Sequence, residues 1–249
     1  MRYFIEIAYN GSNYFGWQMQ PDALSVQQAL EEALSTLLRK EIKVVGAGRT
    51  DTGVHAKQLF AHFDYEKIDQ IQTLVFRLNS FLAKDISVKN IIPVQDDAHA
   101  RFNASEREYE YVVSLGKDPF LEGFAYQLHH RPNLETMNEA AKLLLDYQDF
   151  QCFSRSNTDV KTYNCKVRKA NWKEDKNRLI FTIAADRFLR NMVRAIVGTL
   201  LDVGFGKTSI EEFHSILKSK NRVNAGASAP AQGLFLNKIN YPESIFLKE

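Results

Sequence analysis

The sequence is poor in cysteine and has no long apolar run. Its two cysteines, Cys152 and Cys165, cannot build a disulfide framework or a cysteine-based zinc site. No stretch of about 18 consecutive apolar residues occurs, so we expect no transmembrane helix. Glu6 lies where a signal peptide would have its apolar stretch, so we expect no export and a location in the cytoplasm.

Glycine and proline are also scarce. With 12 glycines, 6 prolines and 12% aromatic residues, the sequence is unlike collagen or a low-complexity chain. Its 45% hydrophobic and 25% charged residues are ordinary values for a soluble globular protein. A length of 249 residues allows one large domain, or two domains of about 100–150 residues with a core each.

Charge of neither sign dominates the chain, whose formal net charge is +2. The distribution is uneven, however. Residues 1–104 contain 11 basic and 12 acidic residues, whereas residues 154–194 contain 11 basic and 4 acidic residues, a net charge of +7. Such a local excess is typical of a surface that binds a polyanion. An ordinary solvated charged face explains it equally well.

The first half alternates strand and helix patterns in the order β-α-β-β-α-β. Aromatic and β-branched residues predict the strands, and apolar residues on one helical face predict the helices. Ser25 and Gln28 form a capping-box start for the first helix. The expected strands are residues 3–9, 42–45, 59–63 and 86–92, the last ended by Pro93, and the expected helices are residues 26–38 and 71–82.

The second half has the order β-α-β-β-α-α-β. Its expected strands are residues 109–115, 167–172, 179–184 and 234–239, and its expected helices are residues 133–147, 188–203 and 209–218. The unit β-α-β-β-α-β is the split βαβ, ferredoxin-like motif. We therefore predict an α+β protein of two such domains, residues 1–104 and residues 105–249, packed against each other.

The most informative segment is residues 46–56, Gly-Ala-Gly-Arg-Thr-Asp-Thr-Gly-Val-His-Ala. Its glycines permit close backbone approach or positive φ. A dinucleotide-binding G-x-G-x-x-G motif would need glycine at Asp51, whose charge would also repel a pyrophosphate. The segment lacks the G-K-[ST] ending of a P-loop as well. Both kinds of nucleotide-binding loop are therefore excluded.

Two interpretations of Asp51 remain. Asp and Thr side chains commonly bond their own backbone in glycine-rich loops, which would make Asp51 part of a structural Asx-turn. Alternatively, the turn holds the carboxylate as a nucleophile or general base, and Arg49 keeps it ionised by lowering its pKa. The local Arg-x-Asp pattern does not decide between the two.

Residues 48–56 resemble the G-R-T-D-[AS]-G-V-H-A motif of the TruA family of tRNA pseudouridine synthases. Thr52 replaces the usual Ala or Ser, and Asn10 stands where the family usually has Asp. Further similar segments follow in the family's order. They are residues 9–18, 100–102, 107–111, 188–194 and 229–236.

The resemblance implies isomerisation of uridine to pseudouridine at positions 38–40 of the tRNA anticodon stem-loop, without a cofactor or metal. Asp51 corresponds to the catalytic aspartate, which attacks uracil C6, attacks C1′ as in nucleophilic glycosidases, or acts as a base on a glycal route. Tyr109 corresponds to the tyrosine that stacks on the flipped uracil. Arg49 corresponds to the arginine that fills the place of the extruded base.

Three arginines of the basic stretch point to an anionic partner on physical grounds. Arg187, Arg190 and Arg194 are three and four residues apart, which places them on one face of the helix expected at residues 188–203. Exposed cations near a helix N-terminus cost roughly 0.3–1 kcal/mol each, so an anionic partner is indicated. We assign Arg187 and Arg190 to tRNA phosphates. By resemblance, Arg194 pairs with Asp51 across the domain junction.

The alternatives to these assignments are structural. Arg187, Arg190 and Arg194 would be snorkelling side chains on a solvated face, Arg49 a surface arginine, and Tyr109 a core residue of the sheet. The resemblance further implies that the two antiparallel sheets lie side by side around a central cleft that holds Asp51, Tyr109 and Arg194. It also implies a homodimer that binds tRNA, with no role for DNA or a membrane.

Two other functional classes stay open. A split βαβ fold can bind single-stranded RNA without catalysis, although the aromatic-rich motif of RRM domains is absent. A carboxylate hydrolase acting on a nucleoside bond would release free uracil, which an isomerase does not.

Overall fold

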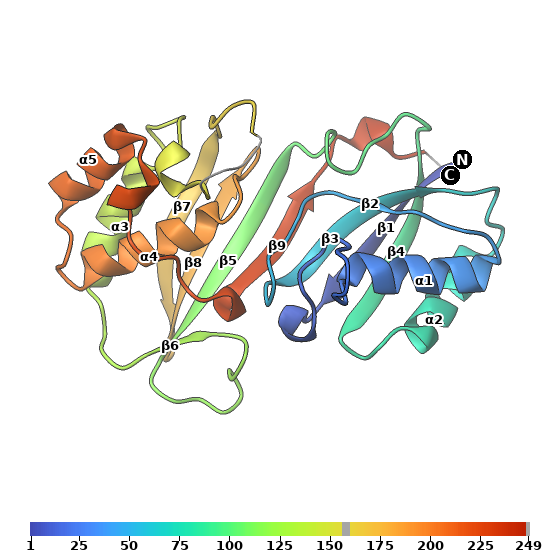
Figure 1. The fold of residues 1–249 in the computed structure, drawn as a ribbon, viewed down its shortest axis with the longest axis horizontal. Coiled ribbons are helices and arrows are strands. Elements are labelled where there is room, and N and C mark those ends of the chain that lie inside the picture. The colour runs from blue at the N-terminus through green and yellow to red at the C-terminus, as the bar shows by residue number, and fades with distance from the viewer. Residues whose placement is uncertain (156–159, 248–249) are drawn as a thin grey trace. The chain divides into compact units, whose positions relative to one another are not determined.

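The computed structural model describes residues 1–155 and 160–247, which form two compact units. Unit 1 comprises Met1–Ser105 together with Phe235–Glu249, and unit 2 comprises Glu106–Leu234. The described residues contain five α-helices and antiparallel strand pairs, so the protein is of the mixed α+β class (Figure 1). No helix in this part of the chain is long and apolar enough to cross a membrane.

Unit 1 is built on strands in the order β4-β1-β3-β9, with β2 also paired to β3. The strands are β1 (Arg2–Tyr9), β2 (Val45–Gly46), β3 (His55–Asp64), β4 (Ile86–Val94) and β9 (Leu234–Asn240). β1 is antiparallel to both β3 and β4, whereas β9 is parallel to β3. Helices α1 (Val26–Leu38) and α2 (Ile71–Phe81) lie on the same side of these strands (Figure 1).

Both faces of β1 are buried. Tyr3, Ile5 and Ile7 share one face because side chains alternate along a strand, and each is at most 1% exposed. Phe4 points to the opposite face, where its ring meets the ring of Tyr241 edge-on at 5.1 Å. Tyr241 also donates a hydrogen bond from its hydroxyl to the carbonyl of Ala100 at 2.6 Å. The C-terminal segment thus completes the core of unit 1.

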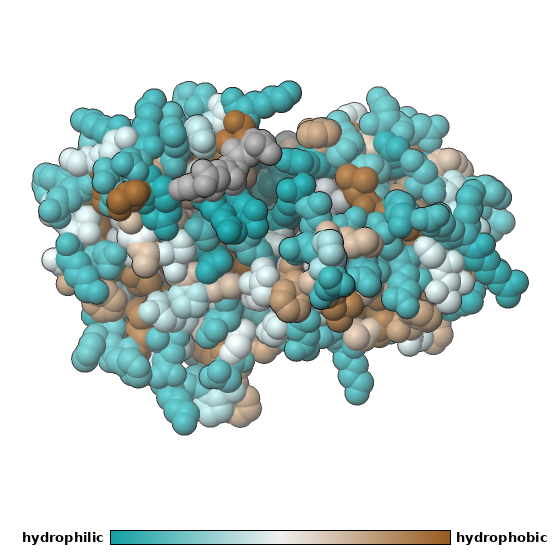
Figure 2. Space-filling model, in the orientation of Figure 1, coloured by the Kyte–Doolittle hydropathy of each residue, from teal (hydrophilic) through white to brown (hydrophobic). Residues whose placement is uncertain are grey.

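Unit 2 has strands in the order β5-β8-β7, and β6 runs parallel to β5. These strands are β5 (Glu106–Leu115), β6 (Tyr126–Leu128), β7 (Val167–Asp175) and β8 (Arg178–Ala185), and the helices are α3 (Leu134–Leu143), α4 (Met192–Gly204) and α5 (Ile210–Ser219). Helix α4 is buried along most of its length. The visible face of each unit is largely hydrophilic, with apolar residues scattered over it (Figure 2).

An asparagine side chain pairs with the backbone of an edge strand in each unit. In unit 1, Asn79 of α2 donates to the carbonyl of Val88 and accepts its N–H, both at 2.8 Å. In unit 2, Asn138 of α3 makes the same two bonds with Trp172, at 3.1 and 2.7 Å. Each amide therefore replaces one missing ladder partner of the edge strand and connects it to a helix.

The compact units differ from the predicted domains at the C-terminal end. The first division, after Ser105, lies one residue from the predicted boundary, but residues 235–249 pack with unit 1 instead of the second domain. The physical reason is the pairing of β9 with β3, together with the contacts of Tyr241 in the core of unit 1.

Local details also differ from the sequence prediction. The strand expected at residues 42–45 is reduced to Val45–Gly46, because side chains of α1 bind the backbone instead: Ser35 accepts from Ile42 N–H and Glu31 accepts from Val44 N–H. Strand β4 continues through Pro93, and the short strand β6 was not predicted.

Candidate functional site

The segment around Asp51 connects β2 to β3, and we call residues 46–56 the Asp51 loop. Its first turn is fixed by a hydrogen bond from Ala47 N–H to the carbonyl of Phe60 at 2.7 Å. Its last turn is closed by a hydrogen bond from Val54 N–H to the carbonyl of Asp51 at 3.1 Å. Gly53 adopts φ 76°, a left-handed conformation that favours glycine. Asp51 is half-buried on this turn.

A second segment, residues 9–17, packs against the Asp51 loop and holds it in place. The hydroxyls of Tyr9 and Thr50 form a buried hydrogen bond of 2.8 Å. Trp17 N–H donates to the carbonyl of Thr50 at 3.2 Å. These contacts hold the residue next to Asp51 by both its side chain and its backbone. We call residues 9–17 the bracing segment.

Two glycines allow the bracing segment to approach this closely. A Cβ atom on Gly11 would lie 2.0 Å from the carbonyl oxygen of Val54. A Cβ atom on Gly16 would lie 2.4 Å from the carbonyl oxygen of Thr50, and Gly16 also has φ +88°. The sequence prediction covered the glycines of the Asp51 loop but missed these two. Their signal was present in the N-terminal motif, which contains both glycines.

His55 has a structural position at the end of the loop. Its side chain is 1% exposed, and its Nδ1 accepts a hydrogen bond from Gly11 N–H at 3.0 Å. Its ring stacks on Phe235 of β9 at 4.7 Å. An imidazole that accepts at Nδ1 carries its proton at Nε2 when it is neutral. These contacts give His55 a structural role in the motif, and that role does not require proton transfer by its imidazole.

Arg49 lies on the same loop as Asp51, and its side chain is exposed. The hypothesis that Arg49 acts on the Asp51 carboxylate stays a prediction. An exposed guanidinium next to the loop is available to contact a bound molecule.

In unit 2, two tyrosines of β5 have different environments. Tyr109 is half-buried, and its ring meets that of Phe188 edge-on at 5.1 Å. Tyr111 is fully buried and donates its hydroxyl proton to the carbonyl of Pro230 at 2.8 Å. Burial raises the pKa of the Tyr111 hydroxyl well above its ordinary value. Tyr111 is thus a core residue, whereas part of Tyr109 remains accessible.

Arg194 lies in the first turn of α4 and is held by the segment that covers this helix. Its Nε donates to the carbonyl of Ala229 at 2.7 Å, and its own carbonyl accepts from Ala229 N–H at 2.9 Å. Gly198 lets that segment approach α4, since a Cβ there would lie 1.8 Å from the carbonyl oxygen of Ala227. The side chain and the main chain of Arg194 are thus both bonded to Ala229.

Arg187 and Arg190 do not lie on α4, which corrects the prediction that they share a helical face with Arg194. The helix begins at Met192, after Asn191 in a left-handed conformation at φ 66°. Asp186 ends the preceding strand, because its Oδ1 accepts the N–H of Arg187 at 2.7 Å. Both arginines therefore belong to the turn between β8 and α4. The energetic cost of a cation in the first turn of a helix does not apply to them.

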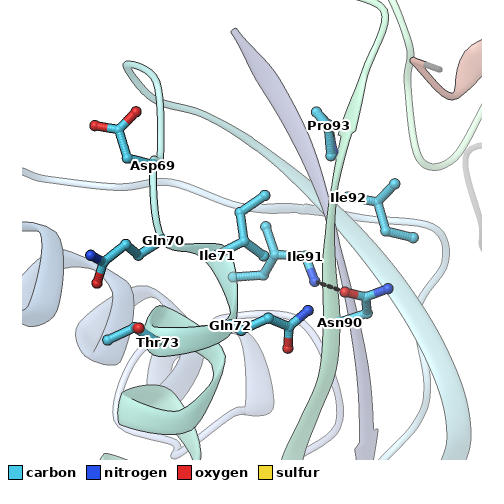
Figure 3. Close-up of a pocket in the computed structure, with 9 residues that line it drawn as sticks. All are labelled: Asp69, Gln70, Ile71, Gln72, Thr73, Asn90, Ile91, Ile92 and Pro93. Atoms are coloured by element: carbon cyan, nitrogen blue, oxygen red, sulfur yellow. Dashed lines mark hydrogen bonds between the residues drawn. The ribbon is translucent and has the colours of Figure 1, made fainter. Parts of the chain in front are cut away.

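A hollow of about 510 Å³ lies elsewhere in unit 1, beside the start of α2 and the strand β4 (Figure 3). Asp69, Gln70 and Thr73 line one side, and Asn90 lines the other, where its Oδ1 accepts from Ile91 N–H at 2.9 Å. None of the residues predicted for the site lines it. Its one charged side chain, Asp69, would repel a phosphate. Within the described residues, no group of three or more His, Cys, Asp or Glu side chains could hold a metal ion.

The fold and these side chains define the class of protein. A carboxylate on a braced turn is a typical nucleophile or general base, and a guanidinium bonded to a neutral backbone carbonyl is a typical partner for a negative charge. The molecule is thus an α+β protein whose candidate reactive group is the Asp51 carboxylate.

Comparisons with known proteins identify the family. A family model described as tRNA pseudouridine synthase matches residues 6–103 and 140–242. The tRNA pseudouridine synthase A of Parabacteroides distasonis is 52% identical over 246 residues, covering 98% of both chains. That of Bacteroides fragilis is 51% identical over 248 residues, again covering 98% of both chains. That of Haemophilus ducreyi is 39% identical over 244 residues, covering 97% of this chain and 94% of the relative.

The chain belongs to the tRNA pseudouridine synthase family. This confirms the resemblance inferred from residues 48–56 and the segments that accompany them.

Proposed function

We propose that this protein converts uridine to pseudouridine at positions 38–40 of the tRNA anticodon stem-loop. The family supports tRNA as substrate and isomerisation as the reaction. The N1–C1′ bond of the nucleotide breaks, the uracil turns, and a C5–C1′ bond forms. The C5 proton leaves to solvent, and N1 takes up a proton from solvent. Reactant and product have the same composition. The observation that supports Asp51 as the reactive group is the bracing of its loop by residues 9–17.

Asp51 acts as the nucleophile or base in this reaction. Enzymes of this kind must take the target base out of the stack, because its reacting atoms are inaccessible within a helix. Arg49, exposed beside Asp51, occupies the space that the extruded uridine leaves. A rigid loop favours catalysis because the carboxylate needs no reorganisation when the base enters.

The proposal gives Tyr109 and Arg194 roles at the same uridine. The accessible part of the Tyr109 ring stacks on the flipped uracil, and its hydroxyl assists the removal of the C5 proton. Arg194 pairs with the Asp51 carboxylate. Arg187 and Arg190, in the turn before α4, contact tRNA phosphates. We further propose that the protein acts as a homodimer in the cytoplasm, where tRNA is modified.

The direct test uses unmodified tRNA that carries tritium at uridine C5. The wild-type protein should release tritium from positions 38–40 and leave pseudouridine in the RNA. Asp51→Asn should reduce release by at least 10³-fold, on the order of what removal of a catalytic carboxylate costs, while it keeps most of the tRNA affinity. Asp69→Asn, which removes an exposed carboxylate elsewhere in unit 1, is the matched control and should release tritium at the wild-type rate.

The same experiment separates the alternatives. Free uracil in the supernatant would show a hydrolase, and tRNA binding without release or product would show a non-catalytic RNA-binding module. Turnover by Asp51→Asn close to that of wild type would remove Asp51 from the mechanism.

A further inference from the structure

A basic hollow of about 320 Å³ lies in unit 2, and its lining is entirely polar or charged. The residues that line it are Gln151, Ser154, Arg155, Tyr163, Lys220, Asn221 and Arg222. Three of these side chains are cationic, and no carboxylate lines the hollow among the residues that the structure describes. Its volume is at the lower end of the range for ligand sites.

Two short helices form the walls of the basic hollow. One wall is η2 (Gln151–Phe153) with Ser154 and Arg155, and the other is the connection from α5 to η3 (Arg222–Asn224). Phe153 is fully buried and packs against Phe213 of α5 at 6.3 Å, which fixes the first wall to the helix. Asn221 caps η3 by accepting from Val223 N–H at 3.1 Å. The walls are therefore held by the core of unit 2.

Two cations of the basic hollow, Arg222 and Lys220, can still attract an anion. Arg222 donates to the carbonyls of Ala225 and Gly226 and to the hydroxyl of Ser228, all neutral acceptors. Lys220 has an acidic partner, Asp149, at 2.9 Å, which leaves two of its three N–H donors for another acceptor. Arg155 adds a third cationic side chain to the lining. The basic hollow thus combines a net positive charge with neutral hydrogen-bond donors.

The basic hollow is connected to the turn that contains Arg190. Arg155 donates its backbone N–H to the carbonyl of Arg190 at 3.1 Å. The turn between β8 and α4 and the basic hollow are therefore neighbouring parts of one basic surface. Of the three cations of the basic hollow, Arg155 belongs to the charge excess in residues 154–194, whereas Lys220 and Arg222 come from the segment after α5.

We propose that the basic hollow binds a backbone phosphate of the tRNA substrate, away from the uridine that reacts. Arg and Lys side chains, together with Ser, Asn, Gln and Tyr, are the groups that contact phosphate oxygens in protein–nucleic acid complexes. All of these residue types line the basic hollow. The inference rests on the proposed action on tRNA, and it assigns to Arg155 and Lys220 a role in holding the RNA.

The test compares Arg155→Gln/Lys220→Gln with Lys142→Gln/Lys173→Gln. The control pair removes the same charge from exposed positions of unit 2 that do not line the basic hollow. Binding of unmodified tRNA is measured by fluorescence anisotropy between roughly 50 and 200 mM KCl. The first variant should bind tRNA at least about tenfold more weakly. Its slope of log affinity against log salt concentration should also be shallower, by roughly 0.7–0.9 for each phosphate that it no longer binds. The control should change affinity less than about twofold.

A second variant, Arg155→Lys/Lys220→Arg, preserves charge and should bind close to wild type; thermal unfolding verifies that all variants fold. Equal affinity and slope for the first variant and the control would overturn the proposal. A third measurement is the stabilisation of wild type by inorganic phosphate at constant ionic strength. If the first variant loses this stabilisation but keeps its tRNA affinity, the hollow is a site for small anions, and the proposal is overturned. Binding does not require turnover, so failure here leaves the tritium-release test of the proposed function intact.

Discussion

At the scale of single residues, the Asp51 loop depends on glycines that carry no Cβ atom. Gly11 and Gly16 lie in the bracing segment where any side chain would overlap backbone of the loop. Gly48, within the loop itself, has nothing within 4 Å of the position of a Cβ. Gly11 and Gly16 are therefore required for the close approach of the two segments, whereas Gly48 is not, although the sequence alone does not distinguish them.

Gly16→Ala should destabilise the protein and displace the loop. The new Cβ would lie 2.4 Å from the carbonyl oxygen of Thr50, and φ +88° is unfavourable for alanine, so a loss of about 2–4 kcal/mol in the free energy of unfolding is expected. Urea denaturation measures the loss, and tritium release should fall with it. Gly48→Ala is the matched control, with a change within about 0.5 kcal/mol. Equal stability of the two variants would contradict the bracing role of residues 9–17.

His62 makes stability depend on pH. It is 6% exposed on β3, its Nδ1 accepts from Ala100 N–H at 3.2 Å, and burial, with the positive charge of Arg2, lowers its pKa from 6.5 to about 4. Between these values the unfolded chain binds more protons than the folded one, so stability rises with pH. Its contribution is complete above pH 6.5 and is lost as pH falls towards 4.

His62→Asn, which keeps an acceptor near the position of Nδ1, should remove this dependence. Urea denaturation across the same pH window should show wild type losing up to about 3 kcal/mol more than the variant. Parallel curves for the two proteins would show that His62 is not the group responsible.

At the scale of elements, helices are connected to strands by specific side chains. Glu31 and Ser35 of α1 replace a predicted strand pairing at residues 42–44, and Asn79 and Asn138 satisfy edge strands. Sequence periodicity finds the helices, because apolar spacing is a local property. It cannot find these polar contacts, because their partners are defined only when helix and strand are packed together.

Asn79→Ala should destabilise unit 1. The substitution leaves the N–H and carbonyl of Val88 without their side-chain partners at the edge of the sheet, at a cost of about 1–3 kcal/mol. Gln72→Ala, at an exposed position of the same helix, should change stability by less than about 0.5 kcal/mol. Urea denaturation of both variants measures the difference, and equal midpoints would show that the paired bonds contribute nothing.

At the scale of the whole molecule, unit 1 is discontinuous in sequence. Its last segment follows the residues of unit 2 along the chain. Phe235 stacks on His55 at the end of the Asp51 loop, and Tyr241 fills the core beside Phe4. The stability of the unit that carries Asp51 therefore depends on residues at the other end of the chain.

Tyr241→Ala should loosen unit 1 selectively. Loss of a half-buried aromatic ring that packs on Phe4 costs about 2–4 kcal/mol. Amide hydrogen exchange should become faster in β1 and β3 and remain unchanged in α3 and α4. The control Tyr147→Ala removes a ring that contacts His214 in unit 2, so faster exchange should there be confined to unit 2. Faster exchange in both units for Tyr241→Ala would contradict the separate core of unit 1.

The sequence by itself determined the α+β class, the bounds of α1 and the motif that contains Asp51, because helix periodicity, capping and turn residues act over a few neighbouring positions. It wrongly placed Arg187 and Arg190 on a helix, because apolar spacing predicted that the helix begins before them or between them. In the structure Asp186 accepts the N–H of Arg187, and Asn191 adopts a left-handed conformation, so the helix begins only at Met192. Only the tertiary structure decided that β9 joins unit 1, that residues 9–17 brace the Asp51 loop, and that Arg155 and Lys220 line one hollow. Each of these depends on pairing or packing between residues tens to hundreds of positions apart, which no local pattern encodes.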